Sequence, residues 1–215
     1  MTRSFLQTDI YGITCEAMSA GRSNLETVRE LLQAGVQIIQ YREKEKTKRE
    51  KFAQCLALSK MCKKAGALFI VNDDVDIALA AQADGVHVGQ DDLPADIVRA
   101  LVGSKVIVGV SAGNTKEAAA AVACGADYLG VGPIFATGTK LDAGAPIGLE
   151  FLAYLKARYT LPLVAIGGIN PENITQVFQS GADSAAMISA LVSSSELGAT
   201  VRATRQRLKE HGFAG

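Results

Sequence analysis

The chain has 215 residues, 48% of them hydrophobic, and its 22 lysines and arginines balance its 22 aspartates and glutamates. This length suits one α/β domain with a substantial core, and we expect residues 1–215 to form that single domain. Zero net charge argues against a general attraction to nucleic acid or to anionic membranes. No apolar stretch has the length of a membrane span or of a secretory signal, which predicts a cytoplasmic protein.

Short β-branched runs alternate with stretches of helical periodicity along the whole chain. The expected strands are 10–14, 36–41, 68–71, 85–88, 106–110, 128–131, 163–166 and 184–188. The expected helices are 25–34, 49–65, 76–81, 95–102, 116–124, 149–159, 172–180 and 196–210. Most strand runs lack polar alternation, as parallel strands covered on both faces do. Eight βα units in one domain predict an α/β fold, a single (β/α)8 TIM barrel, and a doubly wound open sheet is the alternative.

The four cysteines have irregular spacing and include no CxxC pair. We expect free, packed thiols, which agrees with a reducing compartment. These cysteines are Cys15, Cys55, Cys62 and Cys124.

Polar motifs stand where several of the expected strands end. Strand ends converge on one face of a TIM barrel, so residues far apart in sequence can share one site. The four most polar motifs are Gln40-Tyr41-Arg42-Glu43-Lys44, Asn72-Asp73-Asp74, Gly89-Gln90-Asp91-Asp92 and Thr137-Gly138-Thr139-Lys140.

The loops after the last two strands indicate an anion site. Gly167 and Gly168 follow the seventh strand, and Ile188 and Ser189 end the eighth. In such barrels these loops often bind phosphate, because glycines let backbone N–H groups approach it and a serine hydroxyl donates. The alternative is that the glycines only permit a tight turn.

Asp73 and Asp92 are the candidate magnesium ligands. Magnesium takes oxygen ligands and usually only one or two protein carboxylates, with phosphates and waters completing the octahedron. The alternative for each aspartate is to cap the helix that follows.

Arg42 and Lys44, just past the second strand, share a face at two-residue spacing, and Gln40 within the strand lies on the same face. The guanidinium fork and the ammonium group suit pyrophosphate oxygens, although a solvated charged loop is the alternative. The loop from Thr137 to Lys140 is rich in small and hydroxyl residues and suits a mobile lid, with an irregular surface loop as the alternative.

Two further strand residues are less informative. Ser111 ends the fifth strand and can donate to the same anion. A lone strand histidine such as His87 is more often packed or hydrogen-bonded than catalytic.

The motifs QYREK, VNDD, DGVHVGQDD, VGVS, ADYLGVGPIFATGTK, IGGI and MISAL occur in this order from about Tyr11 to Leu191. Together they resemble the thiamine-phosphate synthase (thiamine-phosphate pyrophosphorylase) family. The resemblance implies a TIM-barrel transferase that couples hydroxymethylpyrimidine pyrophosphate to thiazole phosphate with Mg2+, giving thiamine phosphate and pyrophosphate. It implies a dissociative reaction, in which the pyrimidine-CH2–O bond breaks before the thiazole nitrogen attacks. The implied partners are these small molecules; the oligomeric state is left open.

The resemblance also implies roles for individual residues. Asp73 and Asp92 hold magnesium, while Arg42, Lys44, Asn72 and Lys140 bind the pyrophosphate. Gln40 orients the pyrimidine, and Ser111 contacts the departing pyrophosphate. Arg42, Ser111 and Lys140 are thus the catalytic candidates. The thiazole phosphate is bound by Thr137, Thr139, Gly168, Ile188 and Ser189.

The chain departs from the family pattern at two positions, which bear only on fine substrate contacts. Gly113 stands near the place of a common histidine, and Leu141 replaces a common second lysine. One alternative function is a thiazole tautomerase, an isomerase on a similar barrel that needs no pyrophosphate cluster. A non-catalytic thiamine-phosphate binding protein is another.

Overall fold

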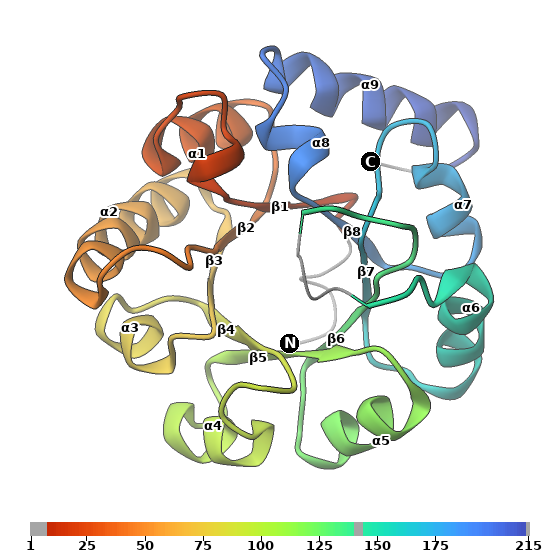
Figure 1. Ribbon diagram of the computed structural model, residues 1–215, viewed down its shortest axis with the longest axis horizontal. Helices are drawn as coiled ribbons and strands as arrows, with labels where there is room; N and C mark the ends of the chain where they lie inside the picture. The colour runs from red at the N-terminus through yellow and green to blue at the C-terminus, as the bar shows by residue number, and fades with distance from the viewer. Residues whose placement is uncertain (1–7, 140–143, 214–215) are drawn as a thin grey trace.

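The computed structural model describes residues 8–139 and 144–213, and within them eight parallel strands close into a barrel (Figure 1). Each strand pairs with the next, and β1 pairs with β8, so Tyr11 lies in register with Ile38 on one side and Ala186 on the other. The closed barrel confirms the predicted TIM fold and excludes the open sheet. The strands are β1 (Ile10–Ile13), β2 (Ile38–Tyr41), β3 (Leu68–Asn72), β4 (Gly85–Val88), β5 (Ile107–Ala112), β6 (Tyr128–Val131), β7 (Leu163–Ile166) and β8 (Ser184–Met187).

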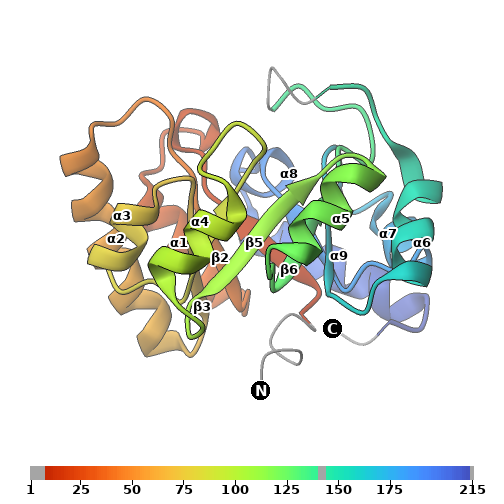
Figure 2. The same cartoon turned by 90° about the horizontal axis from the view of Figure 1, so that it is seen from below.

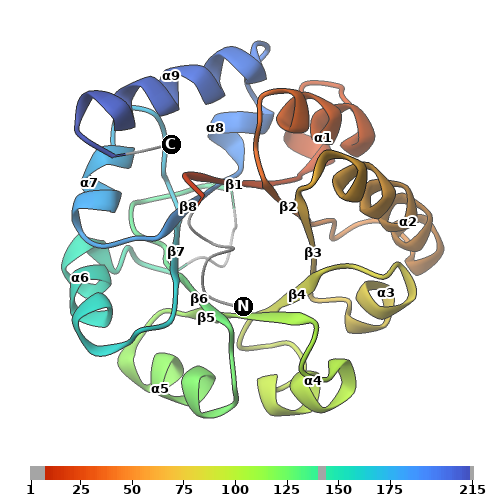
Figure 3. The same ribbon diagram turned by 180° about the vertical axis from the view of Figure 1, so that it is seen from behind.

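Helices surround this ring of strands in views from both ends of the barrel (Figures 1 and 3). In the described part of the chain, none is long and apolar enough to cross a membrane. The 3-10 helix η1 spans Glu16–Met18, and the α-helices are α1 (Asn24–Gln33), α2 (Lys48–Ala65), α3 (Val75–Ala80), α4 (Ala95–Val102), α5 (Thr115–Ala123), α6 (Gly148–Arg158), α7 (Ile174–Gln179), α8 (Ser189–Val192) and α9 (Leu197–Glu210).

Side chains alternate between two cores, because successive strand residues point to opposite faces of the sheet. Ile10 packs outward between the strands and the helices, whereas its neighbour Tyr11 belongs to the core inside the barrel. The buried residues of the inner core are Tyr11, Ile13, Ile38, Ile70, Ile107, Tyr128, Val164 and Ala186. Side chains therefore fill this part of the barrel interior.

The predicted boundaries hold within about two residues, with informative exceptions. The run 184–188 was expected to be strand throughout, but β8 ends at Met187 and Ile188 begins the turn into α8. Both η1 and α8 were missed, since each is too short to show a helical period. Cys55 and Cys62 are buried free thiols as expected, whereas Cys15 and Cys124 are only partly buried.

Candidate functional site

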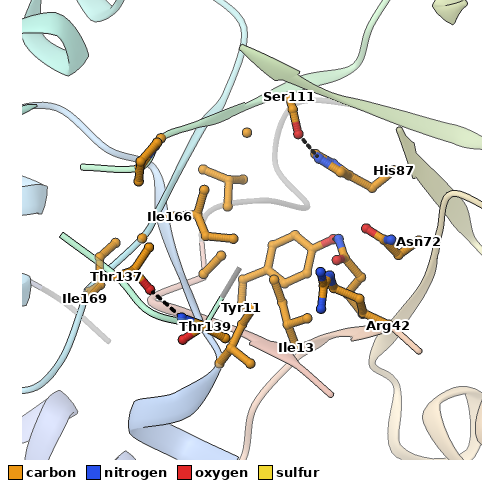
Figure 4. Close-up of a pocket in the computed structure, with 18 of the residues that line it drawn as sticks. Tyr11, Ile13, Arg42, Asn72, His87, Ser111, Thr137, Thr139, Ile166 and Ile169 are labelled. Carbon is orange, nitrogen blue, oxygen red and sulfur yellow. Dashed lines mark hydrogen bonds between the residues drawn. The ribbon is translucent and has the colours of Figure 1, made fainter. Parts of the chain in front are cut away.

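An open cavity of about 990 Å³ lies at the carboxyl ends of the strands. In the side view, the described parts of the connection between β6 and α6, residues 132–139 and 144–147, project beyond this end of the barrel (Figure 2). Arg42 and Asn72 lie on one side of the cavity, Thr137 and Thr139 lie on the other, and the ring of Tyr11 stands between them (Figure 4). The predicted residues that line the cavity are Gln40, Arg42, Asn72, His87, Ser111, Thr137, Thr139, Gly168, Ile188 and Ser189.

Three further predicted residues form a charged cluster beside the Arg42 and Asn72 end. Lys44 Nζ donates to Asp73 Oδ2 over 2.6 Å, and Asp73 directly follows Asn72. Gly89 N donates to Asp92 Oδ2 over 2.8 Å. Lys44, Asp73 and Asp92 are not among the described residues that line the cavity itself. The same strand ends thus contribute residues both to the cavity lining and to the charged cluster at its rim.

Neither aspartate caps the following helix. The cap residue of α3 is Asp74 and that of α4 is Pro94, and neither makes a side-chain cap hydrogen bond. Asp73 has a φ of 63°, a left-handed conformation that is uncommon for a non-glycine residue and that concentrates at functional sites. The capping alternative is therefore wrong for both Asp73 and Asp92.

The electrostatics of the aspartate pair suit a cation. Burial raises the pKa of the Asp92 carboxyl, the neighbouring Asp73 raises this pKa further, and Gly89 N–H and Lys44 oppose the shift. Like charges held this close repel unless a positive charge lies between them. Within the described residues no group of three or more His, Cys, Asp or Glu side chains is placed so that it could hold a metal ion by itself. Two carboxylate donors without such a cage fit magnesium better than zinc or calcium.

In the loop after β2, successive charged side chains point alternately toward the cavity and away from it. Glu43 turns away from the cavity: its Oε1 accepts from Glu16 N and Asn24 Nδ2, both over 2.8 Å. Arg42 N donates to Thr14 Oγ1 over 3.0 Å, which holds the Arg42 backbone to the end of β1. Arg42 faces the cavity and Lys44 reaches Asp73, so the loop is not merely a solvated surface.

The other end of the cavity is built from β6, β7 and β8. Thr139 N donates to Thr137 Oγ1 over 3.2 Å, and Thr139 Oγ1 donates to Ser189 Oγ over 3.1 Å. Gly168 has a φ of 64°, and a Cβ added there would lie 2.5 Å from the carbonyl oxygen of Ala136. Only glycine permits this close packing, so Gly168 serves the turn and the cavity wall together.

A chain of hydrogen bonds crosses the inside of the barrel and includes two tyrosines that the sequence analysis missed. It links Gln40 to Tyr11, Tyr11 to Tyr128, Tyr128 to His87, and His87 to Ser111. Figure 4 draws the bond between His87 and Ser111. Tyr11 and Tyr128 are 117 residues apart in sequence. The available signal was the strand tyrosine Tyr128 together with Gly109 and Gly130, which leave room for the rings of Tyr128 and His87.

Lys140 lies outside the described residues, so its predicted place at the pyrophosphate stays a prediction. The departure at Leu141 lies there as well.

Comparisons with known proteins agree on one family. The family model described as "Thiamine monophosphate synthase" matches residues 10–191. A thiamine-phosphate synthase of Pelotomaculum thermopropionicum is 52% identical over 200 residues, which cover 93% of this chain and 92% of the relative. One from Moorella thermoacetica is 50% identical over 200 residues, covering 93% of this chain and 95% of the relative. The solved thiamine phosphate pyrophosphorylase of Pyrococcus furiosus has a TM-score of 0.87 and 36% identity, covering 95% of this chain and 96% of that one.

Proposed function

Because this chain belongs to the thiamine monophosphate synthase family and is an alkyl-transferring enzyme of thiamine biosynthesis, we propose that it joins hydroxymethylpyrimidine pyrophosphate to thiazole phosphate in a magnesium-dependent reaction. The observation that carries the proposal is the bipolar cavity, with Arg42 and Asn72 at one end and Thr139 and Ser189 at the other. A cavity with a cationic end and a hydroxyl-rich end accommodates two phosphorylated substrates, with their reacting atoms in the space between.

The pyrophosphate belongs at the charged end. Arg42 offers planar paired donors, Lys44 offers a compact charge, and Asn72 offers an amide donor. Ser111, on the same side, donates through its hydroxyl. We include Lys140 among the pyrophosphate ligands only because it belongs to the Thr137-Gly138-Thr139-Lys140 motif.

Asp73 and Asp92 would hold the magnesium ion. When bound, the ion would supply positive charge to the leaving pyrophosphate oxygens. The carboxylates' part is to fix its place, and the Lys44–Asp73 contact keeps one of them oriented beforehand. Because Lys44 is 53% exposed on its side chain, its ammonium group can exchange this partner for a phosphate oxygen.

The thiazole phosphate belongs at the opposite end. Thr137, Thr139 and Ser189 provide hydroxyl donors, and the turns at Gly168 and Ile188 bring backbone close to the cavity. These groups bind the phosphate and thereby set the direction in which the thiazole ring faces the middle of the cavity. Gln40, which lines the cavity and donates to Tyr11, orients the pyrimidine.

The bond changes require no net proton transfer. The pyrimidine-CH2–O bond breaks and its electron pair leaves with the pyrophosphate; the thiazole nitrogen lone pair then forms the new bond to the carbon. The protein's task is to stabilise charge on the leaving group, and removal of one such preorganised donor commonly costs about 3 kcal/mol. A strong general base is not needed.

The thiazole tautomerase is the less favoured alternative. It would use the hydroxyl-rich end but would have no use for Arg42, Lys44, Asp73 and Asp92 together. The named relatives are synthases, which also favours the transferase. A protein of this family that acts on soluble small molecules fits a cytoplasmic location, which we propose with the function.

The Asp73→Ala variant tests the proposal. We expect pyrophosphate release from the two substrates to fall at least about a hundredfold at saturating magnesium, while the far-UV circular dichroism stays unchanged. Asp76→Ala is the matched control, because Asp76 is an exposed neighbour that pairs with Lys48. Full activity of Asp73→Ala would refute the metal role, and equal losses in both variants would point to the fold instead.

A further inference from the structure

The five-residue hydrogen-bond chain inside the barrel joins the two regions of the cavity that handle the pyrimidine and the leaving group. Gln40 Nε2 donates to Tyr11 Oη over 3.0 Å, and Tyr11 Oη lies 2.9 Å from Tyr128 Oη. Tyr128 Oη lies 2.9 Å from His87 Nδ1, and His87 Nε2 lies 3.0 Å from Ser111 Oγ. All five residues line the cavity; Gln40 and both tyrosines are almost fully buried, and Ser111 is more exposed.

The donors at the start of this chain set its direction. An amide nitrogen can only donate, so Tyr11 Oη accepts from Gln40, and Tyr128 Oη is its other partner, which can take the Tyr11 hydrogen. When Tyr11 donates to Tyr128, the Tyr128 hydrogen goes to His87 Nδ1; a neutral His87 ring then carries its hydrogen on Nε2, which donates to Ser111 Oγ. Burial raises the pKa of both phenols well above the ordinary tyrosine range, so both keep the hydrogens that this order requires. The hydroxyl hydrogen of Ser111 is left to point elsewhere.

Two glycines on neighbouring strands leave space for the rings of Tyr128 and His87. Gly109 lies in register with His87 on β4 and with Tyr128 on β6. A Cβ added at Gly109 would lie 2.1 Å from the Tyr128 ring, and one added at Gly130 would lie 2.8 Å from His87 Cε1. The rings stand 5.4 Å apart between their centroids. Because Gly109 and Gly130 have no side chains, neighbouring strands leave the space that the Tyr128 and His87 rings occupy.

We propose that Tyr128 is a positioning residue of the transfer reaction, which acts through His87 to keep the Ser111 hydroxyl as a hydrogen-bond donor toward the departing pyrophosphate. This inference rests on the proposed function for the identity of the leaving group. Without the Tyr128 hydroxyl, His87 can carry its hydrogen on Nδ1 instead. Ser111 then donates to Nε2, and its hydrogen is turned away from the leaving group.

Kinetics of Tyr128→Phe, Ser111→Ala and the double variant test this coupling. We expect Tyr128→Phe to lower kcat about tenfold, the typical worth of one hydrogen bond to a charged group. KM for the pyrimidine pyrophosphate should stay nearly unchanged, because the donor matters as charge develops on the leaving oxygen. In the Ser111→Ala background, Tyr128→Phe should cause no further loss. Undiminished kcat in Tyr128→Phe, or fully additive losses, would overturn the proposal.

Tyr41→Phe is the matched control. Tyr41 is equally buried, and its hydroxyl donates to Gln54 over 2.9 Å on the outside of the barrel. Tyr41→Phe removes one hydrogen bond and Tyr128→Phe removes two, those to Tyr11 and His87, so both variants lose stability. Only Tyr128→Phe should lose turnover; an equal loss in Tyr41→Phe would mean that general loosening of the fold explains the effect.

Nitrogen-15 NMR of the ligand-free wild type gives a reading that needs neither activity nor a variant. The chain has two histidines. His211 Nδ1 lies 2.9 Å from the carbonyl oxygen of Arg207, so it carries its hydrogen on Nδ1. In mildly alkaline buffer His87 should show the opposite tautomer, with hydrogen on Nε2. Hydrogen on His87 Nδ1 would overturn this inference alone, whereas an inactive wild type with the expected tautomer would overturn only the proposed function.

Discussion

Lys44 and Asp73 lie 29 residues apart in sequence, and their side chains meet in a 2.6 Å ion pair at the rim of the cavity. An ion pair this exposed contributes little to stability, about 0–1 kcal/mol. Its place beside Asp92 and Asn72 points instead to a role in ligand binding. The ion pair holds the Lys44 ammonium group next to the carboxylates, where it can meet a phosphate.

The first prediction concerns that cation. Lys44→Ala should lower pyrophosphate-releasing turnover about a hundredfold, because one leaving-group donor is lost. Its thermal unfolding midpoint should change by little, since the ion pair is exposed. Steady-state kinetics and a thermal melt check both. The control is Lys48→Ala, which removes an exposed lysine that pairs with Asp74 and Asp76; comparable losses in the two variants would argue against a specific role of Lys44.

The second prediction follows from the repulsion within the aspartate pair. Asp92→Asn should raise the unfolding midpoint of the metal-free protein, because it removes a partly buried carboxylate that lies next to Asp73; burial and the Asp73 charge raise the pKa of Asp92. Wild type should gain stability when magnesium chloride is added, and the variant should gain much less. The control is Asp91→Asn, an exposed neighbour. An equal response to magnesium in wild type and Asp92→Asn would exclude Asp92 as a ligand.

The third prediction concerns the phosphate end. Ser189→Ala removes a hydroxyl that contacts Thr139 and lines the cavity. The KM for thiazole phosphate should rise about tenfold, since a hydrogen bond to a charged group is lost, while kcat at saturation changes little. Initial rates over a range of thiazole phosphate concentrations measure this. Ser193→Ala, at the exposed end of α8, should behave as wild type; an unchanged KM in Ser189→Ala would place the phosphate elsewhere.

The fourth prediction tests whether the position of the His87 ring matters for turnover. Gly130→Ala introduces a Cβ 2.8 Å from the imidazole, so the ring must shift and its bond to Ser111 must weaken. We expect kcat to fall about tenfold, as in Tyr128→Phe. Gly198→Ala, in α9, is the control: its Cβ meets nothing closer than an arginine tip at 3.4 Å, and alanine should stabilise the helix by about 0.5–1 kcal/mol. Wild-type turnover of Gly130→Ala would show that the ring position does not matter.

The fold was predictable because it depends on periodicity. The β4, β6 and β7 runs have the predicted bounds, since each is an apolar run bounded by clear breaks in the pattern. Convergence of strand ends then placed Arg42 and Ser189 in one cavity, although 147 residues (189 minus 42) separate them. Short elements such as α8 carry no periodic signal, which is why they were missed.

The hydrogen-bond chain was not predictable in the same way. A lone strand histidine predicts packing or hydrogen bonding, and His87 indeed bonds through both ring nitrogens. The partner Tyr128 follows only from the register of β4, β5 and β6, which sequence periodicity does not give. The left-handed backbone of Asp73, with a φ of 63°, likewise does not follow from sequence periodicity.

The most direct test of the account is pyrophosphate release by the wild-type protein with the pyrimidine pyrophosphate alone, the thiazole phosphate alone, and both, each with and without magnesium. The account predicts stoichiometric pyrophosphate and thiamine phosphate only when both substrates and magnesium are present. Full-rate product formation without magnesium, or tautomerisation of a thiazole substrate without any coupling, would contradict it.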